Sequence, residues 1–171
     1  MRSSSRLTAE LRRWLKNARR LVVLGVGNRM LGDDGAGMMV AERLSKAKPP
    51  QNVMVVKGGI APENFTGKIV GFKPTHLLIV DAAVFRAKPG SLRLFTMDEV
   101  SGLTFSTHRL PLTFLTDYIK HSLPEVDARL LAVKPGRVGW GLKPTREVSA
   151  AAGRAVEALL KSLPETLRKN F

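Results

Sequence analysis

Residues 21–37 read LVVLGVGNRMLGDDGAG, and this stretch decides the fold. Its first part, Leu21 to Leu24, is an uncharged apolar run with β-branched residues, which predicts a buried strand of a parallel sheet. Its second part is rich in glycine, which allows the backbone to turn tightly and another group to approach it. An apolar-periodic segment follows, so the stretch predicts a strand, a glycine loop and then a helix over residues 34–47.

Two adjacent acids, Asp33 and Asp34, stand in this loop just before the predicted helix. One carboxylate there can cap the helix, and the helix dipole favours it by about 0.3–1 kcal/mol. A second carboxylate beside the first repels it. The doublet therefore points to a further role, such as binding a cation.

Composition limits the chemistry that this chain can perform. Its 171 residues predict one domain, and 44% hydrophobic with 25% charged residues is ordinary for a globular protein. We see no apolar run long enough to span a membrane and no secretory signal, and we expect a cytoplasmic protein. Because the chain has no cysteine, thiolate catalysis and cysteine-based metal sites are excluded, and any metal site must use His, Asp, Glu or backbone ligands.

The net charge of +14 is concentrated in part at the N-terminus, where residues 1–20 carry seven cations against Glu10. This segment also predicts an amphipathic helix, with Thr8 as its cap, that packs at the edge of the domain or on a partner. We divide the chain into a basic helical extension, residues 1–20, and an α/β domain, residues 21–171. The charge suits either nucleic acid or a solvated surface that steers an acidic protein, and the lack of interleaved aromatic residues disfavours nucleic acid.

Strand and helix patterns alternate along the rest of the chain. Further strands are predicted at residues 52–56, 76–81, 92–95 and 129–133, and the two-residue period of the third of these suggests an antiparallel edge strand. Helices are predicted to open at Pro62, Pro111 and Pro144. The fold class is therefore α/β, a single domain with a mostly parallel twisted sheet of about five strands and helices on both faces.

Several familiar motifs are incomplete in this sequence. The dinucleotide fingerprint has Met30 at its third glycine position, and Lys57 and Gly58 stand where an acid would bind the ribose. A phosphate-binding loop has Lys and then Ser or Thr at the two positions that Asp33 and Asp34 occupy in this chain. The chain also lacks the G-x-S-x-G and H-E-x-x-H motifs, which disfavours serine and zincin mechanisms.

Three polar residues are placed to meet at one edge of the predicted sheet. Asp34 follows the first strand, Asp81 ends the third, and His108 precedes a helix. Ligands of open α/β sheets bind beyond the carboxyl ends of the strands, and two carboxylates with one imidazole suit an exchangeable or catalytic metal. Simpler roles remain open: Asp34 as a helix cap, Asp81 as an acceptor for backbone donors, and His108 as a polar residue near a helix start.

Four segments in order, GVGNRMLGDDGAG, GGIAPEN, LLIVDA and STHRLPL, resemble the hydrogenase maturation endopeptidase family. The resemblance runs from Leu21 to about Val133 and leaves out residues 1–20. It implies one α/β domain that removes a short C-terminal extension from the large-subunit precursor of a nickel–iron hydrogenase. It also implies that the catalytic and nickel-binding residues are Asp34, Asp81 and His108.

The resemblance leaves the mechanism open. A nickel ion at these residues could polarise the scissile carbonyl and activate water, or the nickel could belong to the substrate's own active site and be recognised before cleavage. Glu63 is a candidate general base, or only a turn residue. Two other functions remain as alternatives: a non-catalytic metal-sensing scaffold for the precursor, and a nucleic-acid-binding module. We expect no membrane partner.

Overall fold

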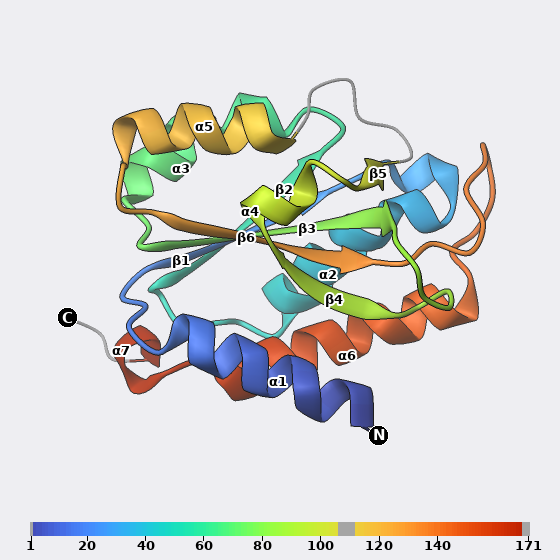
Figure 1. Ribbon diagram of the computed structural model, residues 1–171, viewed down its shortest axis with the longest axis horizontal. Helices are drawn as coiled ribbons and strands as arrows, with labels where there is room; N and C mark the ends of the chain where they lie inside the picture. The colour runs from blue at the N-terminus through green and yellow to red at the C-terminus, as the bar shows by residue number, and fades with distance from the viewer. Residues whose placement is uncertain (1, 106–111, 169–171) are drawn as a thin grey trace.

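A central sheet organises the computed structural model, which describes residues 2–105 and 112–168 (Figure 1). Its strands are β1 (Leu21–Val26), β2 (Val53–Gly59), β3 (His76–Val84), β4 (Leu92–Thr96), β5 (Thr104–Phe105) and β6 (Asp127–Val133). The main order is β2-β1-β3-β6-β4, and β5 pairs with the end of β3. The first four strands of this order are parallel, whereas β4 is antiparallel to β6. The predicted mostly parallel sheet is confirmed.

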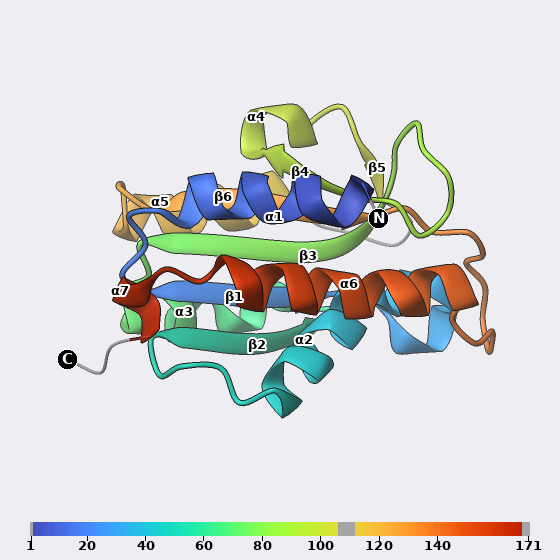
Figure 2. The ribbon, with the colours of Figure 1, turned by 90° about the horizontal axis from the view of Figure 1, so that it is seen from below.

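Helices cover both faces of this sheet (Figures 1 and 2). One face carries α1 (Arg2–Leu15), α2 (Ala36–Lys46) and α6 (Arg146–Ser162), and the other carries α3 (Thr66–Phe72) and α5 (Leu112–Ser122). The shorter elements are α4 (Met97–Val100), α7 (Glu165–Arg168) and the 3-10 turns η1 (Arg29–Leu31), η2 (Asp33–Gly35) and η3 (Pro62–Phe65).

The sheet separates two hydrophobic cores. Successive residues of a strand point to opposite faces, so Leu21 and Val23 pack under α1, α2 and α6, while Val22 and Leu24 pack under α3 and α5. Every residue of β1 is buried, which explains why its sequence is uniformly apolar instead of alternating.

Most predicted boundaries lie within a few residues of those in the structure, and the predicted helix start at Pro111 lies outside the described residues. The assignments of Thr8 and of the end of the third strand were wrong. The Thr8 cap is wrong because α1 begins at Arg2 and contains Thr8. Strand β3 does not end at Asp81 but continues to Val84. The sequence patterns also missed α4 and α7, which have four residues each, and β5, which has two. Elements this short contain too few positions to show a period.

Helix α1 packs on the domain itself. It lies along α6 (Figure 2), and its Leu11 and Leu15 are fully buried in the same core as β1. The Ser162 hydroxyl donates to the backbone carbonyl of Thr8 at 3.1 Å. The division of the chain at residue 20 stays a prediction, but the helix before it shares the hydrophobic core of the sheet.

His76 joins α1 to the amino end of β3. Its ring nitrogens lie 3.1 Å from the carbonyl of Trp14 and 3.0 Å from the hydroxyl of Thr75. Burial lowers the pKa of His76, and the nearby carboxylate of Asp127 opposes this in part. His76 is therefore a neutral structural residue, at the opposite edge of the sheet from Asp81.

This lowered pKa predicts a loss of stability in mild acid. Below the ordinary histidine pKa of about 6.5, the unfolded chain takes up a proton that the folded chain resists, so the free energy of unfolding falls as the pH falls. Urea denaturation at pH 7.5 and pH 5 measures the change. The variant His76→Gln, which has no imidazole to titrate, should lose less stability over this interval than the wild type. An equal loss in both proteins would show that His76 does not contribute.

Candidate active site

The loop after β1 lies beside the carboxyl-terminal part of β3 (Figure 1). The pairing of β1 with β3 ends at Gly25 and Val80, so Asp81 stands one residue beyond the last pair. Turn η2, which contains Asp34, contacts β3. The topology thus places Asp34 and Asp81 at the same edge of the sheet, as the sequence predicts.

Glycines make this close packing possible. A Cβ atom added to Gly37, in the first turn of α2, would lie 2.0 Å from the carbonyl oxygen of Val80. At Gly27, where φ is +129°, an added Cβ would lie 2.0 Å from the carbonyl oxygen of Asp34. Only glycine lets helix α2 and turn η2 approach the strands this closely.

Asp34 is fully buried in η2, and its Oδ2 accepts a hydrogen bond of 2.8 Å from the backbone N–H of Asn28. The interpretation of Asp34 as a helix cap is wrong, because α2 begins at Ala36 with Gly35 as its N-cap and no side chain caps it. The hydrogen bond instead runs backwards across the glycine loop, which fixes the carboxylate relative to the end of β1.

Asp81 is also fully buried, and its Oδ1 accepts a hydrogen bond of 2.8 Å from the backbone N–H of Ala82. A backbone donor therefore does bind Asp81, which was one of its expected roles. Leu77, Ile79 and Ala83 share its parity on the strand and pack under α5, so Asp81 faces the side of the sheet that α5 covers.

His108 lies outside the described residues, in the segment directly before α5. Within residues 2–105 and 112–168, no three His, Asp or Glu side chains gather as metal ligands. The structure thus brings Asp34 and Asp81 to one edge, and the complete set with His108 stays a prediction. Glu63 is exposed in the first turn of η3, and its assignment as a base also stays a prediction.

Asp33 has a role that the sequence analysis missed. Its carboxylate is fully buried and accepts hydrogen bonds from the backbone N–H groups of Gly136, Arg137 and Thr145, at 2.8, 2.8 and 2.6 Å. The hydroxyl of Thr145 adds a contact of 3.0 Å. Asp33 therefore anchors the segment between β6 and α6, which accounts for one acid of the doublet without a cation. No local pattern signals this, because its partners are more than a hundred residues away in sequence.

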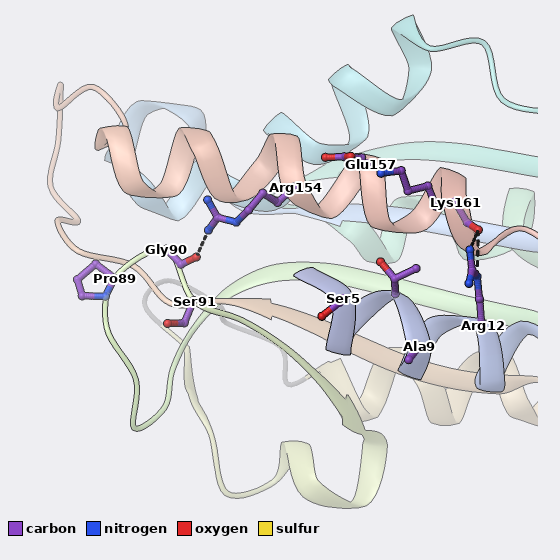
Figure 3. Close-up of a pocket in the computed structure, with 10 residues that line it drawn as sticks. Ser5, Ala9, Arg12, Pro89, Gly90, Ser91, Arg154, Glu157 and Lys161 are labelled. Carbon is purple, nitrogen blue, oxygen red and sulfur yellow. Dashed lines mark hydrogen bonds and ion pairs between the residues drawn. The ribbon is translucent and has the colours of Figure 1, made fainter. Parts of the chain in front are cut away.

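A separate pocket lies between α1, α6 and the turn before β4 (Figure 3). Its cations hold these elements together: Arg154 donates to the carbonyl of Gly90 at 2.7 Å, and Arg12 donates to the carbonyl of Lys161 at 3.3 Å. Neither Asp34 nor Asp81 lines this pocket. We therefore assign it to the packing of the N-terminal helix, apart from the candidate active site.

Comparison with known proteins identifies the family of this chain. The model of a family described as hydrogenase maturation protease matches residues 38–162, which is most of the chain. The chain belongs to the hydrogenase maturation protease family. It is 38% identical to the Hydrogenase 3 maturation protease of Escherichia coli over 139 residues, which cover 81% of this chain and 87% of that protein.

Solved structures of hydrogenase maturation proteases share the fold. The structure of a NiFe hydrogenase maturation protease from Thermococcus kodakarensis superposes with a TM-score of 0.83 and 32% sequence identity, over 90% of this chain and 98% of that one. A hydrogenase-maturing endopeptidase from E. coli superposes with a TM-score of 0.71 and 28% identity, over 85% and 93% of the two chains. This member of the family is therefore a peptidase. None of the helices in the described ranges is long and apolar enough to cross a bilayer.

Proposed function

We propose that this protein removes the C-terminal extension of a nickel–iron hydrogenase large-subunit precursor, and that cleavage depends on nickel. The observation that carries the proposal is the placement of two fully buried carboxylates, Asp34 and Asp81, at the carboxyl edge of the sheet. Ligands of open α/β sheets bind at this edge. Membership of the hydrogenase maturation protease family supplies the class of substrate.

The residues at this edge fit a divalent cation. Two buried carboxylates near each other repel, and a cation relieves that repulsion. Asp34 and Asp81 with the imidazole of His108 would offer two oxygens and one nitrogen, a set that suits a first-row metal and leaves positions open for substrate. When bound, nickel would polarise the scissile carbonyl and lower the pKa of a water molecule.

The protein's own contribution is to fix the two carboxylates before the substrate arrives. The N–H of Asn28 holds one oxygen of Asp34, and the N–H of Ala82 holds one oxygen of Asp81. Such preorganisation avoids the free energy cost of orienting the ligands during the reaction. The same arrangement serves recognition equally well if the nickel arrives in the active site of the precursor. In that case, cleavage would be restricted to loaded precursors.

The decisive experiment mixes the full chain with nickel-loaded and nickel-free precursor and follows the intact mass of the precursor by mass spectrometry. We expect the loaded precursor to lose a C-terminal peptide and the nickel-free precursor to keep it. Loss of the same peptide from both forms would contradict nickel dependence. Stable binding of the loaded precursor without any loss of mass would contradict peptidase action on this substrate and favour the metal-sensing scaffold.

A further inference from the structure

The segment between β6 and α6 exposes apolar side chains next to the candidate active site. Trp140 is 74% exposed, Val138 39% and Leu142 38%, and Met30 of the neighbouring turn η1 is 54% exposed. Backbone hydrogen bonds join the two segments, from Gly139 to Leu31 and from Gly141 to Met30. We call Met30, Val138, Trp140 and Leu142 together the Trp140 surface.

Hydrogen bonds to the backbone hold the segment that carries Trp140 in place. Asp33 binds the backbone of Gly136, Arg137 and Thr145, and these residues lie on both sides of Trp140 in the sequence. Gly32 pairs with Val138 as an isolated β-bridge. A surface that is ordered before it binds loses little conformational entropy on binding, so fixed exposed apolar groups favour a docking role.

The segment that carries Trp140 is positively charged, and Glu147 is the first acid that follows it in the sequence. Residues 134–146 contain no acid, and the cations in this range are Lys134, Arg137, Lys143 and Arg146. None of them forms an ion pair with the part of the chain that the structure describes. A partner would therefore combine an apolar patch with acidic residues around it, because tryptophan is a typical anchor of an interface and opposite charges at the rim speed association.

Other occupants fit the Trp140 surface less well. A second copy of this chain, with its net charge of +14, would be repelled. Single-stranded nucleic acid stacks its bases on successive aromatic side chains, whereas Trp140 is the one aromatic residue of the surface and its other members are aliphatic.

We propose that the Trp140 surface docks the hydrogenase large-subunit precursor through an apolar patch flanked by carboxylates. This inference rests on the proposed function and adds where the precursor binds. The anchor Asp33 is the residue next to Asp34, so docking on the Trp140 surface fixes the precursor relative to the buried carboxylates. Trp140 is thus a positioning residue for cleavage, and it acts without touching the reacting atoms.

Steady-state cleavage of the nickel-loaded precursor tests this role. For Trp140→Ala we expect KM to rise about tenfold or more with kcat nearly unchanged, since truncating a central aromatic contact weakens binding by at least that factor. Trp140→Phe should restore much of the affinity. The matched control is Tyr118→Ala, which removes another aromatic side chain, 62% exposed, from α5. An unchanged KM in Trp140→Ala, or an equal rise in Tyr118→Ala, would overturn the inference.

Tryptophan fluorescence separates docking from cleavage. Trp14 is 7% exposed, so the part of the emission change on adding nickel-free precursor that disappears in Trp140→Phe is assigned to Trp140. We expect a blue shift that weakens at high salt. A blue shift without cleavage of any precursor by the wild type would refute the proposed function and leave the docking intact. Cleavage without a blue shift, or a shift caused only by a single-stranded oligonucleotide, would refute the docking.

Discussion

Replacing Asp34 by Asn is expected to reduce precursor cleavage by about 100-fold or more, and Asp81→Asn should do the same, since catalytic groups that stabilise charge contribute at least this much. Each change replaces one of two fully buried carboxylates, the proposed ligands, by a neutral amide. Each Asn keeps a carbonyl oxygen that can still accept from the backbone N–H of Asn28 or Ala82. The fold should therefore survive, and the loss should appear in kcat/KM measured by mass spectrometry.

Asp117→Asn provides the matched control for both variants. It removes the same charge from an exposed position of α5, and cleavage should be unchanged. The variant His108→Ala completes the set, and we expect it to be inactive as well. Wild-type cleavage of the nickel-loaded precursor by Asp34→Asn or Asp81→Asn would show that these carboxylates are not the reactive site.

Replacing Asp33 by Ala is expected to lower the free energy of unfolding by about 3–5 kcal/mol, because several hydrogen bonds to a charged acceptor, each worth about 1.5–3 kcal/mol, are lost together. The change leaves the N–H groups of Gly136, Arg137 and Thr145 without the fully buried carboxylate that accepts from them. Urea denaturation followed by circular dichroism measures the effect.

The variant Asp34→Asn is the control for Asp33→Ala. Asp34→Asn should unfold at nearly the wild-type urea concentration although it is inactive, whereas Asp33→Ala should be the less stable protein. A loss below about 1 kcal/mol in Asp33→Ala would mean that water replaces the carboxylate and that Asp33 is not an anchor. The two adjacent acids would then have to be assigned again.

The fold could be predicted from the sequence because the spacing of apolar residues indicates which side chains are buried. The uncharged run of β1 indicates a strand covered on both faces, and the alternation of Leu92 to Phe95 indicates the antiparallel strand β4. The cap at Thr8 failed for a physical reason. A threonine inside a helix cannot be told by residue type from a threonine that begins one, and Thr8 lies inside α1, which begins at Arg2.

The candidate site could be predicted in part. The order of strands and the rule for parallel sheets placed Asp34 and Asp81 at one edge, since the carboxyl ends of parallel strands point the same way. The sequence did not distinguish the two acids of the doublet. Asp33 and Asp34 have the same chemistry, and their different roles depend on which backbone donors the fold brings to each.

The sequence by itself determined the layered α/β fold and, through the absence of cysteine, restricted any metal ligands to oxygen and nitrogen groups. These properties follow from composition and from the spacing of apolar residues, which are local. Tertiary structure alone decided that Asp33 anchors the segment that carries Trp140 while turn η2, which contains both acids, lies against β3. The Asp33 contacts join residues about a hundred positions apart, and the contact of η2 with β3 also joins segments far apart in the sequence, so no local pattern encodes which distant groups a buried carboxylate will meet.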